Sequence, residues 1–432
     1  MANKTYYTIA PIVKRDLCTG CGTCVGVCPS SAIKIVKDDL KGIFIPQIEE
    51  KSCNYCGICY DVCPGYHINF KELNQKIFGK EPKDNLIGNY IACYIGYAKS
   101  NAIRYNSASG GLVTSLLIFA LENRIIDGAL VTKMNERKPL EPEVFLARTE
   151  EEISLASKSK YCPVPVNVAL KEILKEGGRF AVVGLPCHIQ GIRKYEIVNK
   201  ELKEKIVLHL GLFCSNTPSF LATDYILTRA RCKKEEIIKI DYRGQGWPGN
   251  MRIKFRDGST LTLTDYWGTG FGQYFSPIRC IFCIDQTNEL ADISFGDAWL
   301  PDVIKKDKIG TSIVISRTKI GQEILEKATI NNIISLNSIN RDKVVQSQGN
   351  IWSFKKTNLR TRILLLRFFN KKEHPIYTSA RLLEPGFNDF LKMTFRFLGR
   401  SMASKKSLWN VINSYAYLSN FLVRLLERHK RF

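Results

Sequence analysis

The middle of the chain alternates short apolar runs with segments whose apolar residues recur every three to four positions. A buried strand is predicted from Arg179 to Val183, followed by a helix from about Ile189. A second strand ends at Phe213, and a helix follows from about Ser219. An earlier apolar stretch likewise precedes a helix predicted from about Leu112 to Asn123. Strands that alternate with helices in this way predict an α/β domain with an open parallel sheet.

A glycine-rich segment, RGQGWPG, has the spacing of a dinucleotide-binding loop at Gly244, Gly246 and Gly249. In nicotinamide-binding folds such a loop opens a helix. Here the next residues, Asn250 to Tyr266, alternate apolar and polar positions around an Asp-Gly turn, which predicts a β-hairpin instead. We therefore expect no nicotinamide site, and the loop stays a candidate for close approach to a flat or anionic ligand.

Length and composition favour a globular protein of more than one domain. The chain has 432 residues, of which 45% are hydrophobic. Its longest apolar run, Leu112 to Leu121, is far shorter than the ~20 residues of a membrane-spanning helix. The residues before Asp16 lack the apolar core of a secretory signal. These features predict a cytoplasmic protein.

The positive charge is concentrated at the C-terminus. The formal net charge is +22, and the segment 355–432 holds 17 Lys and Arg against 4 Asp and Glu. Leucine and aromatic residues recur at helical spacing between Leu408 and Leu426. The pattern predicts a basic amphipathic helical extension that makes peripheral contact with the inner membrane face or docks on a partner; a helix packed back on the body is the alternative. Nucleic-acid binding is not expected, because no base-stacking or groove-reading motif accompanies the charge.

Two early segments, CTGCGTCVGVCP and CNYCGICYDVCP, share the spacing of bacterial two-cluster ferredoxins. Three cysteines of each run ligate one 4Fe-4S cluster, and the fourth ligates the other cluster. One cluster is therefore predicted on Cys18, Cys21, Cys24 and Cys63, and its partner on Cys53, Cys56, Cys59 and Cys28. Interleaved glycines allow backbone amides to approach the sulfurs. Zinc is disfavoured, because a zinc site uses a single set of four ligands.

A further Cys-x-x-Cys pair, Cys280 and Cys283, lies far from the N-terminal cysteines. Cys187 and Cys214 each follow a predicted strand, and the carboxyl ends of parallel strands meet at one edge of a sheet, where ligands bind. These four thiols are candidates for a third four-thiolate site. A thioredoxin-like pair would open a helix after a strand, and a zinc ribbon would have a second pair nearby; neither pattern is present. Three cysteines are expected to be ordinary packed thiols: Cys93, Cys162 and Cys232.

Small residues precede the helix predicted from Leu112: Ser107, Ser109, Gly110 and Gly111. Free N–H groups at such a helix start can bind a phosphate, and the helix dipole favours an anion there. A flavin pyrophosphate would fit. A serine that merely caps a core helix explains the residues equally well.

Several segments taken in order resemble the coenzyme F420 hydrogenase/dehydrogenase beta subunit family: SASGG, SKYCPVPV, GLPCHIQGIRK, HLGLFC, YRGQGWPG and RCIFCIDQTNELADISFGDAW. The resemblance runs from about Cys18 to Ser353 and includes a fused ferredoxin module. It implies an FAD-containing domain with an additional 4Fe-4S cluster, and it supports Cys187, Cys214, Cys280 and Cys283 as the ligands. It also implies FAD contacts at Ser107, Ser109, Gly110, Gly111, Lys158, Ser159, Lys160, Tyr161, Gly184, Pro186 and His188.

The expected fold is α+β and α/β in four parts. A two-cluster ferredoxin module at 1–80 is followed by two parts of a flavin-binding α/β domain at 85–178 and 179–354, then by the basic extension at 355–432. A linker rich in Lys, Gly and Pro is predicted from Lys71 to Gly88.

The function that this resemblance implies is an oxidoreductase. Reduced coenzyme F420 would give a hydride to FAD, and single electrons would pass through the clusters to a redox partner or a hydrogenase/dehydrogenase subunit, or travel in reverse. No catalytic residue is predicted, because the hydride step needs no protein acid or base; His188 and His209 can be structural. Two rivals are a reductase of an organic substrate, for example in polysaccharide biosynthesis, and a ferredoxin-like electron-transfer subunit without a substrate site.

Overall fold

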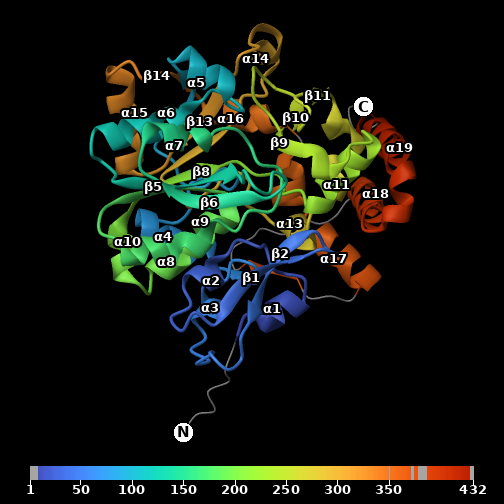
Figure 1. Ribbon diagram of the computed structural model, residues 1–432, viewed down its shortest axis with the longest axis horizontal. Coiled ribbons are helices and arrows are strands. Elements are labelled where there is room, and N and C mark those ends of the chain that lie inside the picture. Colours follow the sequence, from blue (N-terminus) through green and yellow to red (C-terminus); the bar gives the residue numbers. More distant parts are fainter. Residues whose placement is uncertain (1–7, 350, 371–373, 378–386, 429–432) are drawn as a thin grey trace.

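The computed structural model describes residues 8–349, 351–370, 374–377 and 387–428. Figure 1 shows a central sheet flanked by helices, the N-terminal segment below it, and the C-terminal helices beside a small sheet on the right. The N-terminal residues 1–7, used above to argue against a secretory signal, lie outside the described part.

The central sheet has eight strands in the order β14-β4-β13-β12-β8-β7-β5-β6. Its parallel core consists of β5, β7, β8 and β12, and the remaining strands pair antiparallel. The expected parallel sheet is therefore correct only for the core. Short connections such as that between β5 and β6 permit antiparallel pairing, whereas parallel strands need a longer crossover. The strands are β4 (Ala92–Ala98), β5 (Gly128–Met134), β6 (Pro142–Ala147), β7 (Phe180–Gly184), β8 (Ile206–Leu212), β12 (Ile293–Asp297), β13 (Ser312–Ser316) and β14 (Ile334–Ile339).

Helices cover both faces of this sheet because its strands alternate their buried side chains. On β5, Ala129 and Val131 belong to one hydrophobic core, and Leu130 between them belongs to the other. The first face is packed by α6 (Leu112–Glu122), α7 (Glu150–Leu155) and α15 (Lys319–Ile330), and the second by α8 (Leu170–Lys175), α9 (Pro186–Glu196) and α10 (Lys200–Lys205). Further helices near the sheet are α5 (Asn101–Asn106), α14 (Pro301–Lys306), α16 (Arg341–Gln348) and the 3-10 turn η1 (Val166–Ala169).

The N-terminal module contains an antiparallel strand pair and short helices. Its elements are α1 (Ala10–Lys14), α2 (Thr23–Gly26), β1 (Ile33–Asp38), β2 (Ile43–Ile48), α3 (Ile58–Asp61), β3 (His67–Ile68) and α4 (Phe70–Phe78). The linker expected from Lys71 to Gly88 is wrong in its first part, because the residues up to Phe78 form helix α4. Asn69 caps the helix by accepting from the amide of Glu72 at 3.2 Å, and Phe70 and Leu73 are buried in the core beneath the sheet.

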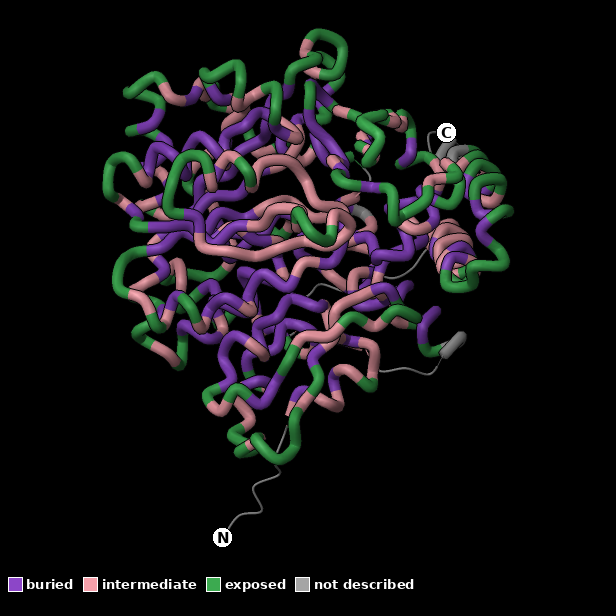
Figure 2. Tube along the Cα trace, in the orientation of Figure 1, coloured by how far each residue is buried: buried purple, intermediate pink, exposed green. Residues whose placement is uncertain are grey.

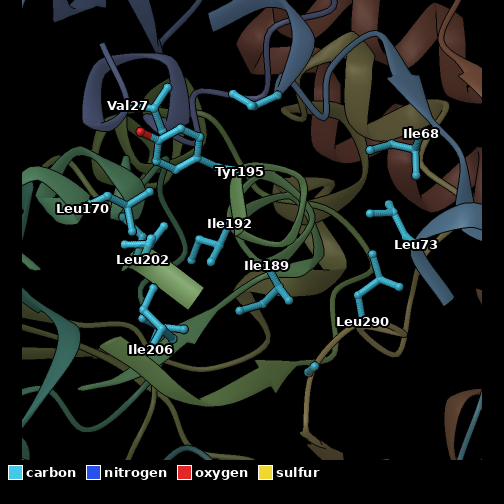
Figure 3. Packing of buried hydrophobic residues seen from close by; sticks show 14 of the residues in the cluster. Val27, Ile68, Leu73, Leu170, Ile189, Ile192, Tyr195, Leu202, Ile206 and Leu290 are labelled. Atoms are coloured by element: carbon cyan, nitrogen blue, oxygen red, sulfur yellow. The ribbon is translucent and has the colours of Figure 1, made fainter. Parts of the chain in front are cut away.

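The module docks on the α/β domain through helix α9. Figure 3 shows Val27 and Ile68 of the module among the buried residues around α9, which carries Ile189 and Ile192. The approach is close: a Cβ at Gly26 would overlap the carbonyl group of Asn167, and one at Gly191 would overlap the Thr23 side chain. The two parts therefore share one hydrophobic core.

A smaller sheet beside the central one confirms the expected hairpin. Strands β10 (Met251–Phe255) and β11 (Thr260–Leu263) pair antiparallel, and β9 (Ile237–Asp241) lies on the other side of β10. No helix follows the glycine loop, as predicted. The neighbouring elements are α11 (Phe220–Arg229), α12 (Phe271–Tyr274), α13 (Ile278–Ile281) and the 3-10 turns η2 (Lys234–Glu236) and η3 (Tyr266–Thr269).

The C-terminal extension packs back on the body. Its elements are the π-helical turn η4 (Ser353–Thr357), α17 (Leu359–Asn370), β15 (Ile376–Tyr377), α18 (Phe387–Ala403), η5 (Lys406–Leu408) and α19 (Trp409–Arg428). Strand β15 pairs with β3 of the N-terminal module. Trp409, Ile412 and Ala416 share a core with Tyr225 and Tyr274 of the body. Figure 2 shows the mixed burial of these helices, and Val411 and Leu418 remain exposed. The alternative, a helix that packs back on the body, is thus confirmed. Contact of the extension with a membrane stays a prediction.

No helix among the described residues is both long and apolar enough to cross a membrane.

Candidate iron–sulfur and cofactor sites

The structure gathers the eight N-terminal cysteines into the two predicted groups. The Cys24 thiol interacts electrostatically with Cys18, Cys21 and Cys63, and most weakly with Cys59 of the other predicted group. The Cys59 thiol interacts with Cys56, Cys28 and Cys53. Each group thus combines three cysteines of one run with the last cysteine of the other, which is the exchange that two-cluster ferredoxins use.

Backbone amides approach the sulfurs where glycine allows it. The amide of Gly20 donates to Cys18 Sγ at 3.3 Å, and that of Gly65 donates to Cys63 Sγ at 3.3 Å. A Cβ at Gly65 would overlap the carbonyl oxygen of Leu17. Gly65 is therefore required by packing, and it keeps an amide close to a predicted ligand.

The chemistry of these thiols fits iron–sulfur ligation. Burial and neighbouring thiols raise the pKa of Cys63 to about 12, and they raise the pKa of Cys59 to about 11. Without a metal the thiols hold their protons, so cluster binding must release them. No group of His, Cys, Asp or Glu among the described residues has the spacing of a single-ion site.

The four downstream cysteines form another group. Cys187 lies in the first turn of α9 after β7, Cys214 follows β8, Cys280 lies in α13, and Cys283 follows it. Burial and four other cysteines raise the pKa of Cys187: Cys21 of the N-terminal module, then Cys214, Cys280 and Cys283. The second group therefore lies next to the first N-terminal group.

Two cations, the buried Arg279 and the half-buried Lys194, connect this second group to the module. Arg279 Nε donates to the carbonyl of Gly65 at 2.6 Å, and its Nη2 donates to that of Pro64 at 2.8 Å. Lys194 Nζ donates to the carbonyls of Cys63 and His67 at 3.2 and 2.9 Å. Both side chains bind the segment that carries a predicted cluster ligand.

The remaining predicted cofactor residues lie at the carboxyl edge of the sheet. Ser107 Oγ donates to the carbonyl of Ile103 at 2.7 Å, and Ser109 Oγ donates to that of Thr311 at 2.9 Å. The amide of Gly110 donates to Ser312 Oγ at 2.9 Å. These groups are engaged within the protein. Gly111, with a φ of 76°, is the N-cap of α6 and gives the first turn no side-chain cap.

The segment Lys158 to Tyr161 lies against the glycine loop. Lys158 Nζ forms an ion pair with Asp241 at 2.9 Å, and a Cβ at Gly244 would contact the Lys158 side chain. Burial lowers the pKa of Lys160 to about 7, while its amine donates to the carbonyls of Ala156, Ser157 and Lys158. Ser159 between them is half-buried.

A buried ion pair that the sequence did not reveal organises the same edge. Arg243 Nη1 binds Asp297 Oδ2 at 2.7 Å and donates to the Tyr161 hydroxyl at 3.3 Å. Trp247 Nε1 donates to Asp297 Oδ1 at 3.1 Å. Arg243 belongs to the segment YRGQGWPG and Asp297 to the segment SFGDAW. No sequence pattern indicates that these two residues form an ion pair.

Exposed aromatic rings accompany this ion pair. Trp299 stands 4.5 Å from Trp247, and Trp267 stands 4.5 Å from Tyr161, measured between ring centroids. Trp267 and Trp299 keep 42% and 40% of their surface exposed, so each offers an apolar surface to a flat ligand at this edge.

The turn from Gly184 to His188 carries Cys187 and is held by structural hydrogen bonds. Pro186 is the first residue of α9. His188 Nδ1 accepts from the amide of Leu185 at 3.0 Å, and its Nε2 bonds the carbonyl of Val164 at 3.0 Å. Burial lowers the pKa of His188 to about 4, so the ring is neutral and Nε2 carries the proton. Asn288 Nδ2 donates to the carbonyl of Gly184 at 2.8 Å.

The three cysteines expected to be ordinary packed thiols, and His209, have structural surroundings. Cys93 and Cys162 are buried, and Cys232 is half-buried. His209 is enclosed by carboxylates, with Glu196 Oε1 at 2.7 Å and Asp292 Oδ2 at 2.9 Å.

Comparison with known proteins agrees with this arrangement. A 4Fe-4S dicluster domain matches residues 17–66, which defines the N-terminal part as an iron–sulfur module. The N-terminal and C-terminal domains of the coenzyme F420 hydrogenase/dehydrogenase beta subunit match residues 93–171 and 177–342. The protein is an iron–sulfur oxidoreductase, and the chain belongs to the coenzyme F420 hydrogenase/dehydrogenase beta subunit family, as the resemblance predicts.

Relatives extend over most of the chain. The beta subunit of coenzyme F420 hydrogenase from Methanosarcina barkeri is 30% identical and covers 60% of this chain and 86% of its own. A subunit of the F(420)H(2) dehydrogenase from Methanosarcina mazei is 27% identical over 74% of this chain and 84% of its own. Coenzyme F420-dependent sulfite reductase of Methanocaldococcus jannaschii is 26% identical over 76% of this chain and 49% of its own.

A solved structure shares the fold. It is a chain of the xenon-derivatised F420-reducing [NiFe] hydrogenase complex from Methanosarcina barkeri, with a TM-score of 0.54 and 24% identity. The match covers 68% of this chain and 98% of that chain.

Proposed function

We propose that this chain is a flavo-iron–sulfur subunit that transfers electrons between coenzyme F420 and a redox partner, with FAD at the carboxyl edge of the sheet and three 4Fe-4S clusters. The observation that carries the proposal is the position of Cys187. Its thiol interacts with Cys21 of the ferredoxin module and with the other three cysteines of the second group. A cluster on Cys187, Cys214, Cys280 and Cys283 would continue the ferredoxin pair towards the sheet edge.

The second group fits a four-thiolate cluster. Its members come from three separate segments of the chain and are half-buried. Burial and the neighbouring Cys280 and Cys283 raise the pKa of Cys214 to about 12. Such a site suits a 4Fe-4S cluster, whose four irons each take one cysteine. Electrons would pass from one predicted cluster to the next, because Cys187 of the second group interacts with Cys21 of the ferredoxin module.

The carboxyl edge fits a flavin. The uncapped first turn of α6 can receive the pyrophosphate. Lys158 and Lys160 lie in the segment against the glycine loop, where their amines bond Asp241 and backbone carbonyls, respectively. Trp267 and Trp299 can pack against a flat ring. When bound, FAD exchanges hydrides as well as single electrons, which is the chemistry needed between a deazaflavin and a cluster. His188 stays neutral and hydrogen bonded, so we assign it a structural role in orienting the turn that holds Cys187.

The partner would carry the second half of the reaction. Relatives of this chain are named as hydrogenase and dehydrogenase subunits, and in the sulfite reductase the matched region is about half of the protein. We propose by analogy that the chain delivers electrons to a separate catalytic subunit or accepts them from it. The four-part division, with boundaries at residues 80, 85, 178 and 354, remains part of the proposal.

Cofactor analysis of Cys280→Ser tests the third cluster. The wild-type protein, purified without oxygen, should contain about twelve irons and the variant about eight, because one cubane is lost. Cys232→Ser is the matched control, since Cys232 lies outside the groups and should leave iron unchanged. An equal iron content in Cys280→Ser would refute the third cluster. A protein with full iron but no flavin would instead favour the ferredoxin-like subunit.

A further inference from the structure

The start of the C-terminal extension places buried positive charge beside the second cysteine group. Lys355 and Arg362 are 1% and 0% exposed, although a charged side chain normally stays in water. Both lie beyond residue 342, where the match to the family ends. We refer to Lys355 and Arg362 as the cationic pair.

The described contacts of Arg362 are with neutral groups, including the Phe354 ring, whose centroid lies 4.5 Å from the guanidinium carbon. The guanidinium donates to the carbonyls of Asn358 at 3.2 Å and Lys355 at 3.0 Å, and also to that of Ile281. Ile281 stands between Cys280 and Cys283 in the sequence. In the described part of the chain no carboxylate forms an ion pair with Arg362. Its charge interacts electrostatically with the side chains of Tyr377 and Cys283.

Lys355 acts on the same group from η4. Its side chain is 1% exposed and interacts electrostatically with the thiols of Cys214 and Cys280, and its carbonyl accepts from Arg362 Nη2 at 3.0 Å. Arg400 of α18 interacts with Cys280 as well. Cations from separate parts of the extension therefore converge on the second cysteine group.

A buried charge without a counter-charge is strongly unfavourable. A 4Fe-4S cluster with four thiolates carries net negative charge, and one-electron reduction adds another negative charge. The cationic pair would offset both. Because attraction grows with the charge of the cluster, nearby cations stabilise the reduced form and raise the reduction potential.

We propose that Lys355 and Arg362 set the reduction potential of the third cluster. By raising this potential, the cationic pair makes the cluster easier to reduce by a donor at the sheet edge. This inference rests on the proposed third cluster. It assigns a role to the extension: α17 and η4 carry the charges that set the reduction potential of a cluster bound by the family domain.

An EPR-monitored redox titration of the full-length holoprotein tests the inference, with Arg362→Gln compared to wild type. The signal of the third cluster is identified as the one absent in Cys280→Ser. Arg362→Gln should make reduction of this cluster at least tenfold less favourable, which is 59 mV for a one-electron couple. Arg362→Lys should keep most of the wild-type potential. Arg367→Gln is the matched control, because Arg367 is on the same helix but exposed, where solvent screens its charge.

The outcomes separate the two proposals. An unchanged potential in Arg362→Gln with full iron content would overturn the role of the cationic pair and leave the third cluster standing. A wild-type protein with only about eight irons would refute the third cluster itself. If Arg362→Gln fails to retain iron, Lys355→Met decides by the same titration: a lowered potential supports the inference, and an unchanged one overturns it.

Discussion

Arg279 joins the two cysteine-bearing regions by donating from Nε to the carbonyl of Gly65 at 2.6 Å. Arg279 directly precedes Cys280, and Gly65 follows Cys63 by two residues. The bond therefore links a ligand of the proposed third cluster to the segment that holds a ferredoxin ligand. Both residues are buried, so water does not compete for this hydrogen bond.

Removing this link should loosen the junction between the clusters. Arg279→Met leaves the carbonyls of Pro64 and Gly65 buried without a donor, which costs about 1–3 kcal/mol for each unsatisfied group. We expect a lower thermal midpoint of the holoprotein than in the exposed control Arg256→Met. Equal midpoints for the two variants would show that the link contributes nothing to the junction.

The docking of the ferredoxin module should be sensitive to one methyl group. In Gly26→Ala the added Cβ overlaps the Asn167 carbonyl group, which is backbone and cannot swing away. Overpacking of this kind costs about 1–3 kcal/mol. Limited proteolysis should release the module faster than in Gly177→Ala, where nothing lies near the added atom. Identical cleavage rates would contradict the tight interface.

A buried charge network should make stability fall on both sides of neutral pH. Burial and Arg193 oppose the charge on His209, but Glu196 and Asp292 outweigh them and raise its pKa. Burial likewise opposes the Asp292 charge, yet Arg193 and His209 hold the pKa of that carboxyl well below its usual value. The pKa of Glu196 is also lowered, with His209 and Arg193 overcoming burial.

The sign of each effect follows from these directions. The stability from His209 is complete below its unfolded pKa of about 6.5 and is lost as pH rises through the higher folded value. The stability from Asp292 and Glu196 is present above their unfolded pKa values and is lost as pH falls through the lower folded ones. His209→Gln should remove most of the alkaline loss from a plot of thermal midpoint against pH. A variant with an unchanged alkaline slope would exclude His209 as its source.

The C-terminal helices should be integral to the fold. Trp409 is 6% exposed and packs against Tyr225 and Phe275 with ring centroids 5.8 Å away in each case. Trp409→Ala should cost about 3–5 kcal/mol, which calorimetry can measure if unfolding is reversible. Tyr417→Ala is the control, because Tyr417 is 79% exposed. A similar loss in both variants would argue against specific packing of Trp409.

The sequence predicted the elements whose pattern is local. Helix α6 begins at the expected Leu112, β7 is shifted by one residue from the expected strand, and the hairpin around Gly258 forms as its Asp-Gly turn requires. The two N-terminal cysteine groups were also predictable, since the spacing of the ligands within each run is a local property. Helix α4 was missed because Lys and Gly around it resemble a linker, whereas burial of Phe70 and Leu73 decides its structure.

Long-range relationships could not be read in the same way. The Arg243–Asp297 ion pair joins a loop to the end of strand β12 through the tertiary fold, and no periodicity marks either partner. Arg362 looked like one of many basic residues in a solvated tail, yet it is fully buried. Charge content alone does not distinguish a surface cation from one held against a cofactor site, because the difference lies in packing.

Electron transfer from coenzyme F420 is tested by an anaerobic absorbance titration of cofactor-replete protein with the reduced coenzyme. We predict that the flavin and iron–sulfur bands bleach together as the deazaflavin is oxidised, which would establish electron flow from hydride donor to clusters. Unchanged bands in protein with full flavin and iron would contradict the account and point to a reductase of another organic substrate.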